Sequence, residues 1–209
     1  MPTFKHRHTG KEIFFAHIPR TAGRYVDANL LWRNDFEWKE IDMDTGNGVM
    51  SIVNGFEIAH YHREHYEKYL DVEGIPHFSI VRNPFKRFIG ASPYIKRLYG
   101  DDIQELMEDP NYFFSMMEGF LSIRGESANW FRPMVDFIRE DTKIWRFEDG
   151  FGDDFVKWLG DIIGVELKFH DLEYPKQKDE HNKLDLTPKL IENLRQLYRK
   201  DIERFYPDI

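Results

Sequence analysis

One short loop near the N-terminus combines arginine with small residues. The segment His17-Ile-Pro-Arg-Thr-Ala-Gly-Arg24 follows an apolar run, Ile13 to His17, and precedes apolar residues at helical spacing. Small residues let the backbone approach a ligand closely, and the first N–H groups of a helix favour an anion. Arg20 and Arg24 add guanidinium groups that can bind phosphate or sulfate oxygens in a bidentate manner. These residues indicate an anion site, but a plain strand-to-helix turn with two exposed arginines fits them equally well.

A second arginine-bearing loop follows another apolar run. His77 to Val81 has the composition of a buried strand, and Arg82 comes where that strand should end. Pro84 suits the first turn of a helix, and Arg87 lies about one turn into it. Two such loops on neighbouring strands would hold a ligand with two separate anionic groups. Taken alone, Arg82 is also compatible with a charge that merely flanks a helix.

Three histidines lie together in the segment Ala59-His-Tyr-His-Arg-Glu-His65, after a predicted strand at Phe56 to His60. Histidine has a reference pKa of ~6.5, so it can act as a general base near neutral pH, and it is also the commonest metal ligand. A catalytic base, a surface cluster and a metal site all fit these residues. The metal site is the least favoured of the three, because no carboxylate stands at a known metal-ligand spacing. His6, His8 and His181 lie in polar stretches that we expect to be mobile, and they receive no role.

Strands that alternate with helices must position these residues. The sequence predicts strands at 13–17, 56–60, 77–81 and 143–147, and helices after residue 24, after Pro84, over most of 101–140, from 151 and from Thr187-Pro188. This alternation implies an α/β fold with a parallel sheet covered on both faces, whose ligands bind at the carboxyl ends of the strands. Because there is no repeat or linker, we expect residues 1–209 to form a single domain.

Composition narrows the possible function classes. The net charge is −8, so we expect no whole-molecule attraction to nucleic acid or to an anionic membrane. The chain has no cysteine, which excludes disulfides, zinc–thiolate sites and a cysteine nucleophile. No apolar stretch has the length of a signal peptide or a membrane span, and we therefore expect a soluble, cytoplasmic protein.

The two loops resemble motifs of the carbohydrate sulfotransferases. Phe15 to Gly23 is similar to that family's 5'-phosphosulfate loop, F-x-H-[IV]-P-K-T-A-G-[TS], and Val81 to Ile89 is similar to its 3'-phosphate segment, V-R-[DN]-P-x-x-R-[FL]-x-S. Ile144 to Asp149 and Leu197 to Tyr206 resemble later family segments, so the resemblance spans nearly the whole chain. It implies a P-loop-like three-layer sandwich with a central, mainly parallel sheet. It also implies transfer of a sulfuryl group from 3'-phosphoadenosine-5'-phosphosulfate (PAPS) to a hydroxyl of an acceptor, such as a glycan, with release of 3'-phosphoadenosine-5'-phosphate (PAP).

The resemblance assigns roles to individual residues as well. The donor nucleotide would be bound by residues of the two loops: Pro19, Arg20, Thr21, Ala22, Gly23, Arg24, Tyr25, Arg82, Arg87 and Gly90. The His-x-His pair is similar to that of the uronyl 2-O-sulfotransferase branch, which makes His62 the base and His60 its helper. Arg20 would face the leaving oxygen, and no metal would be required because the loop supplies the positive charge.

Three positions depart from the family pattern. Arg20 stands in place of a lysine, Arg24 in place of threonine or serine, and Gly90 in place of a serine. These changes leave open a sulfotransferase-like protein that binds the nucleotide without catalysis. A kinase of the P-loop type would share the sheet and the anion loop, but its G-x-x-x-x-G-K-[ST] spacing is absent.

The acceptor side is less well defined. Asn129 to Pro133 resembles a segment near the family's active site, and its aromatic residues fit either a sugar-stacking surface or the core. Four basic residues could bind an acidic glycan or simply be solvated: Lys96, Arg97, Arg132 and Arg139.

Overall fold

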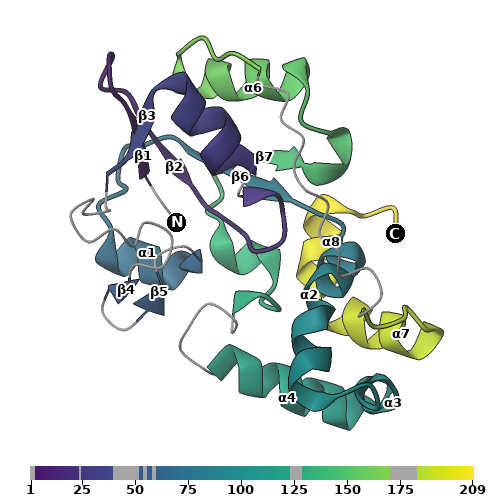
Figure 1. Cartoon of the computed structure of the whole chain (residues 1–209). Helices are drawn as coiled ribbons and strands as arrows, with labels where there is room; N and C mark the ends of the chain where they lie inside the picture. The colour runs from purple at the N-terminus through teal and green to yellow at the C-terminus, as the bar shows by residue number, and fades with distance from the viewer. Residues whose placement is uncertain are drawn as a thin grey trace.

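A mixed five-stranded sheet flanked by helices forms the centre of the protein (Figure 1). This computed structural model describes residues 3–23, 25–39, 52–53, 56–57, 60–122, 129–169 and 183–209. Arg24, which the sequence predicts to bind the donor, lies outside the described residues.

The sheet is parallel on one side and antiparallel on the other. Its order is β3-β1-β2-β6-β7. The strands are β1 (Thr3–His6), β2 (Glu12–Phe15), β3 (Phe36–Trp38), β6 (His77–Val81) and β7 (Lys143–Arg146). β2, β6 and β7 run parallel, whereas β1 is antiparallel to both β2 and β3. The α/β class is therefore confirmed, but a mainly parallel sheet is correct only for the half that contains β2, β6 and β7.

An N-terminal hairpin, which the sequence did not indicate, makes the antiparallel half. The chain reverses between β1 and β2 with Gly10 at φ 70°, a left-handed conformation that glycine adopts without strain. His6 is only 8% exposed, and its Nδ1 lies 2.8 Å from the hydroxyl oxygen of Thr9. The expectation of a mobile polar stretch is therefore wrong for His6, because a local partner allows the ring to be buried. His8 remains exposed, and His181 lies outside the described residues.

The strand predicted at 56–60 does not join this sheet. β4 (Ile52–Val53) and β5 (Phe56–Glu57) form a separate antiparallel pair. His60 follows at the approach to α1 (Arg63–Tyr69).

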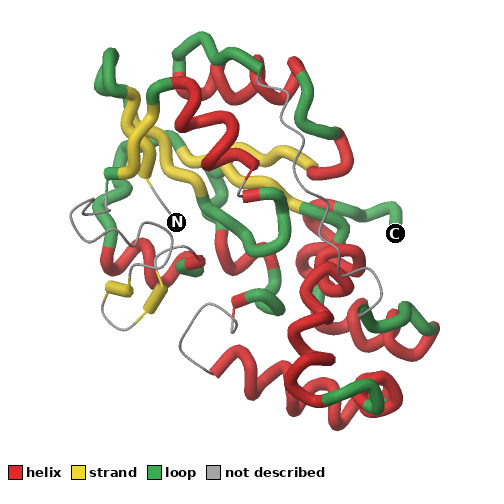
Figure 2. Tube along the Cα trace, viewed as in Figure 1, coloured by secondary structure: helices red, strands yellow, loops and turns green. Residues whose placement is uncertain are grey.

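Helices account for most of the remaining described chain, as the red segments of Figure 2 show. After β2 come a π-helix and a short 3-10 helix, η1 (Tyr25–Leu31) and η2 (Trp32–Asn34). The later helices are α2 (Pro84–Tyr99), α3 (Ile103–Glu108), α4 (Pro110–Ser122), η5 (Met134–Phe137), η6 (Phe147–Asp149), α6 (Asp153–Ile163), α7 (Pro188–Leu197) and α8 (Arg199–Phe205). Among the residues that are described, no helix is long and apolar enough to cross a membrane.

Alternating side chains of the sheet supply two separate cores. Phe14 and Val81 pack on one face with residues of α1 and η5, while Phe15 and Ile80 pack on the other with residues of η1 and α6. Successive strand residues point to opposite faces, so β2 and β6 are apolar throughout because both of their faces are covered. A third core lies among α2, α3, α4 and α7, beside the sheet (Figure 1).

Two predicted helix starts are confirmed by their caps. Asn83 precedes α2, and its side-chain oxygen accepts hydrogen bonds from two backbone N–H groups of the first turn, both at 3.1 Å. Thr187 caps α7 in the same way, at 3.3 Å. The stretch 101–140 is helical only in part. Pro133 directly precedes η5, and the carboxylate of Asp201 accepts the N–H groups of the first two residues of η5, Met134 and Val135.

The carboxyl ends of β2, β6 and β7 lie at the same edge of the sheet because these strands are parallel. The loops that begin after Phe15, Val81 and Arg146 therefore meet there.

Candidate anion and histidine site

The loop after β2 contains two non-glycine residues in left-handed conformations. Arg20 has φ 69° and Ala22 has φ 72°. Such conformations cost on the order of 1–3 kcal/mol each and persist where the surroundings impose them, often at functional sites. Between them Thr21 is fully buried, and its hydroxyl donates to the carbonyl of Ile18 at 2.7 Å. That internal bond holds the turn, so the hydroxyl of Thr21 faces the protein interior.

Gly23 is required by a close approach of His17. A Cβ at position 23 would lie 1.7 Å from Nε2 of His17, which is far inside van der Waals contact. The His17 ring stacks on Phe15, with centroids 5.1 Å apart, and lies 4.5 Å from the ring of His60. The imidazole therefore fills the space over the glycine and connects the anion loop to the histidine cluster.

Arg82 reaches back from the end of β6 to the first loop. Its Nη1 donates to the carbonyl of Arg20 at 3.1 Å, and its guanidinium lies 4.4 Å from the centre of the Phe147 ring. Burial lowers the pKa of Arg82, and the carboxylate of Glu148 opposes this shift. Its Nε is buried and has no hydrogen-bond partner among the described residues.

Gly90 marks the point where the two arginines converge. A Cβ built at this position of α2 would lie 3.5 Å from Nη1 of Arg82 and 3.8 Å from Nε of Arg20. Arg20 and Arg82, from two loops that are distant in the sequence, therefore meet beside Gly90 of α2, and all three were predicted to bind the donor.

Arg87 does not join that group. Its side chain is fully buried, and it donates to the carbonyls of Trp130 at 3.1 Å and Arg132 at 2.6 Å. Its guanidinium also lies 5.2 Å from the centre of the Tyr198 ring. Arg87 therefore connects the segment 129–132 to α2. The sequence had instead suggested that Arg87 binds the donor nucleotide.

The histidines lie against that same segment. His60 and His62 are 6% and 7% exposed, and the rings of His62 and His65 are 4.0 Å apart. The side-chain amide of Asn129 donates to the carbonyl of His60 at 2.7 Å, and Nε of Arg132 donates to the amide oxygen of Asn129 at 2.8 Å. The chain around His60 is thus held by groups that Arg87 positions.

Burial, the charge of Arg132 and the neighbouring His65 lower the pKa of His62 to about 3. His62 is therefore neutral at pH 7 and able to accept a proton. In the described part of the chain, no group of three or more histidine or acidic residues is arranged to hold a metal ion.

Aromatic side chains lie beside the arginines, and two of them, Tyr25 and Trp130, belong to segments that the sequence had suggested for the site. The guanidinium of Arg20 lies 5.8 Å from the centre of the Trp130 ring, whereas the neighbouring Phe131 is fully buried in the third core. Partly exposed Tyr25 donates its hydroxyl to the carbonyl of Phe151 at 3.1 Å. Trp130 thus packs against the third core and also contacts Arg20, whereas Phe131 lies wholly within that core.

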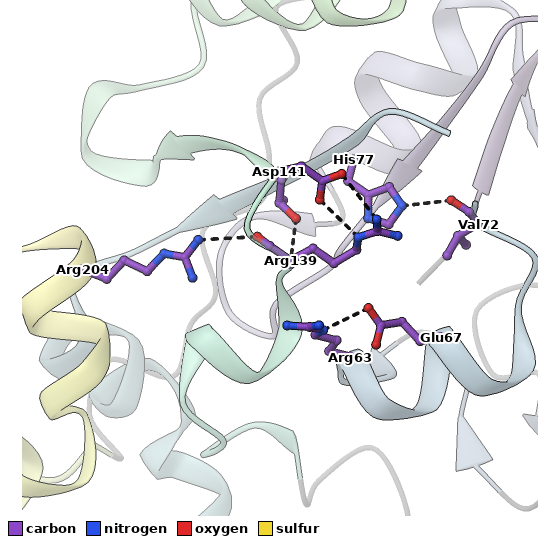
Figure 3. Close-up of polar contacts among 8 residues, drawn as sticks. Arg63, Glu67, Val72, His77, Arg139, Asp141 and Arg204 are labelled. Atoms are coloured by element: carbon purple, nitrogen blue, oxygen red, sulfur yellow. Dashed lines mark hydrogen bonds and ion pairs between the residues drawn. The ribbon is translucent and has the colours of Figure 1, made fainter. Parts of the chain in front are cut away.

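The four basic residues considered for an acidic acceptor differ in their surroundings. Arg139 pairs with Asp141 at 3.1 Å near His77, at the start of β6 (Figure 3). His77 itself contacts the carbonyl of Val72 at 3.2 Å, so this cluster lies at the opposite end of the strand from Arg82. Lys96 pairs with Asp101 at 3.2 Å, and the guanidinium of Arg97 lies over the ring of Tyr94. Of the four, Arg132 is the one whose charge acts on His62.

The geometry thus combines two converging guanidinium groups, a strained loop and a neutral, buried histidine in one region. Comparisons with protein-family models, with curated proteins and with solved structures found no match to this chain. A function is therefore inferred from these structural features.

Proposed function

We propose that this chain is a sulfotransferase that takes a sulfuryl group from PAPS and transfers it to a hydroxyl of a carbohydrate. The observation that carries the proposal is the convergence of Arg20 and Arg82 beside Gly90, since these residues belong to the two loops that resemble the donor-binding motifs. A nucleotide with a phosphosulfate and a 3'-phosphate needs positive charge from two loops at one edge of the sheet, and this arrangement supplies it.

The surroundings of the arginines suit the base of a nucleotide as well as its phosphates. Tyr25 and Phe151 have ring centroids 5.1 Å apart, and Phe147 lies 5.4 Å from Phe151. All three rings are partly exposed. Aromatic faces next to guanidinium groups can stack on a purine base while the phosphates meet the charge.

His62 is the base in this proposal. It is neutral at pH 7, and it would accept the proton of the acceptor hydroxyl as that oxygen attacks sulfur. The guanidinium groups would stabilise the negative charge that develops on the leaving nucleotide, which favours the transition state over the ground state. His60, tied to Asn129 through its carbonyl and to His17 through its ring, would hold the segment that carries His62.

Calorimetric titration with PAP, ADP and ATP tests the donor assignment. We expect PAP to bind clearly tighter than either of the other nucleotides, because only PAP carries the 3'-phosphate. Equal binding of all three would contradict the proposal. Tighter binding of ATP that depends on magnesium would favour a kinase of the P-loop type instead.

A nucleotide-binding protein without turnover is the second candidate. The pKa of about 3 at His62 favours it, because so weak a base removes a hydroxyl proton with difficulty unless the bound anion raises that pKa. A His62→Ala variant separates the two candidates in an assay of sulfuryl transfer from PAPS. An enzyme would lose turnover and keep PAP binding, whereas a binding protein would show no turnover in either form.

A further inference from the structure

The outer edge of β7 carries no further strand among the described residues. β7 is the last strand in the order of the sheet, and its partner is β6, with Lys143 beside Phe78 and Arg146 beside Val81. In a parallel pair, alternate residues direct their backbone N–H and C=O groups to the neighbouring strand, so the other residues of β7 direct theirs outward. Such a row of backbone groups is a template for one more extended strand.

A groove with a volume of about 560 Å³ lies at this edge. Its floor includes Ile144, Trp145 and Arg146 of β7. Trp158 of α6 lines it on one side, and Arg204 of α8 lines it on the other. Figure 1 shows the same arrangement, with β7 between α6 and α8. The groove is therefore a channel along an open strand edge, with one wall from each face of the sheet.

The two walls of the groove differ in chemistry. Trp145 packs toward α6, and its ring lies 5.3 Å from the ring of Trp158. Arg146 follows Trp145 and so points to the opposite face, where its guanidinium lies 5.3 Å from the centre of the Tyr206 ring. Arg204 belongs to that face as well. One wall is thus aromatic and the other is cationic.

The positive charge of the groove is not balanced within the part of the chain that the structure describes. Arg146 and Arg204 are both exposed, and neither forms an ion pair with another described residue. Arg204 donates instead to the carbonyl of Arg139 at 3.4 Å. Asp149 is the one carboxylate in the lining. On a chain with a net charge of −8, this edge is a local site for negative charge.

We propose that the outer edge of β7 binds an extended segment of a partner protein in which acidic and apolar residues alternate. The segment continues the sheet through backbone hydrogen bonds to β7. Its side chains point alternately to the two faces. The apolar ones contact Trp145 and Trp158, and the carboxylates contact Arg146 and Arg204.

A second copy of this chain fits the edge less well. Antiparallel pairing of two β7 strands, centred between Ile144 and Trp145, places Lys143 opposite Arg146 across the interface. Like charges directly opposite each other destabilise a strand pair, and lysine on an edge strand is a common device against self-association. The charges therefore favour an acidic partner over another copy.

The other edge of the sheet, β3, differs from β7 in its charges. Glu37 of β3 pairs with Arg7 at 3.3 Å, and Lys39, just beyond the strand, pairs with Glu12 at 2.9 Å. These pairs balance the charges of that edge within the chain. β3 is therefore an internal reference for the measurements on β7.

Fluorescence anisotropy of the labelled peptide acetyl-S-E-V-E-V-E-S-amide measures binding to the full chain. We expect a dissociation constant on the order of 100 μM or tighter, and binding about tenfold weaker when lysine replaces each glutamate. Methylation of all backbone nitrogens between the terminal serines removes the strand donors but keeps the side chains, so it should abolish binding. No binding of the glutamate peptide, or equal binding of the three peptides, would overturn the proposal.

Arg204→Glu tests the cationic wall, and Arg195→Glu is its matched control. Both arginines are exposed, donate to a backbone carbonyl and lie over a phenylalanine ring, at 5.4 Å from Phe205 and 5.7 Å from Phe85. Arg204→Glu should weaken the glutamate peptide about tenfold and strengthen the lysine peptide, whereas Arg195→Glu should change neither. Equal effects of the two variants would contradict a contact at Arg204.

Hydrogen exchange, followed residue by residue by NMR, locates the bound peptide. The outward-facing amides of residues 143–146 should exchange several-fold more slowly with the glutamate peptide present, and those of β3 should not change. Slower exchange at β3 alone would place the peptide at the wrong edge and overturn the proposal. Slow exchange at 143–146 without peptide, together with a dimer in sedimentation, would show that a second copy occupies the edge and would also overturn it.

Discussion

Replacing Arg87 separates a structural role from a ligand-binding role. The guanidinium is fully buried, donates to the carbonyls of Trp130 and Arg132, and lies over the ring of Tyr198. Its charge also acts on Asp201, which is itself fully buried. Arg87→Met removes both hydrogen bonds and the charge while keeping most of the apolar volume.

The expected cost follows from these contacts. A hydrogen bond from a charged group contributes roughly 1.5–3 kcal/mol, and removal of one partner from a buried polar network costs roughly 3–5 kcal/mol in total. Burial already raises the pKa of Asp201 to about 6, with Arg87 opposing the rise, so loss of Arg87 leaves that carboxylate with less compensation. We therefore expect Arg87→Met to lower the free energy of unfolding by about 3–4 kcal/mol. Arg87→Lys, which keeps the charge but loses the fork, should lower it by about 1–2 kcal/mol.

Equilibrium unfolding in urea, followed by tryptophan fluorescence, measures these values. Arg97→Met is a suitable control, because Arg97 is exposed and lies over the ring of Tyr94 without a buried partner, so its loss should cost no more than about 0.5 kcal/mol. The reasoning is refuted if Arg87→Met unfolds within about 1 kcal/mol of the native protein. If that stable variant also loses PAP binding, Arg87 contacts the ligand instead.

Two further changes probe the loop and the histidine cluster. Gly23→Ala should displace the His17 ring, which lies between Phe15 and His60, and so lower the free energy of unfolding by about 1–3 kcal/mol and weaken PAP binding. The control Gly119→Ala should change neither quantity, because a Cβ there meets nothing within 4 Å. A native melting curve for Gly23→Ala would contradict the close approach of His17 to Gly23. The pKa of His62 is about 3 in the folded state, below its unfolded value of ~6.5, so the unfolded chain takes up a proton first and the stability contribution of His62 is lost as pH falls from 7 towards 5. Between pH 7 and pH 5, the His62→Gln variant should therefore lose about 1 kcal/mol less unfolding free energy than the native protein, after allowance for solvent screening. Urea unfolding at each pH measures this difference. If the unfolding free energies of the two proteins fall equally with pH, the pKa of His62 is not depressed.

Local patterns predicted the parts of the chain that depend on local physics. The apolar runs before the two arginine loops are β2 and β6, and the helix starts at Pro84 and Pro188 have the caps that their sequences suggest. Buried parallel strands and capped helix ends each leave a signal within a few residues, which is why these elements could be recognised. The hairpin of β1 and β2 was missed because its strands are short and its polar residues gave no alternation strong enough to notice.

The sequence by itself determined that two arginine-bearing loops follow strands and that three histidines lie between them. Only the tertiary structure decided which of those side chains meet. Arg20 and Arg82 are brought together by parallel pairing of β2 with β6, a contact between segments 62 residues apart. Arg87, five residues after Arg82, is instead buried against the segment 129–132. The physical reason is that side-chain direction and burial depend on packing between distant segments, whereas residue type and spacing report only on the chain nearby.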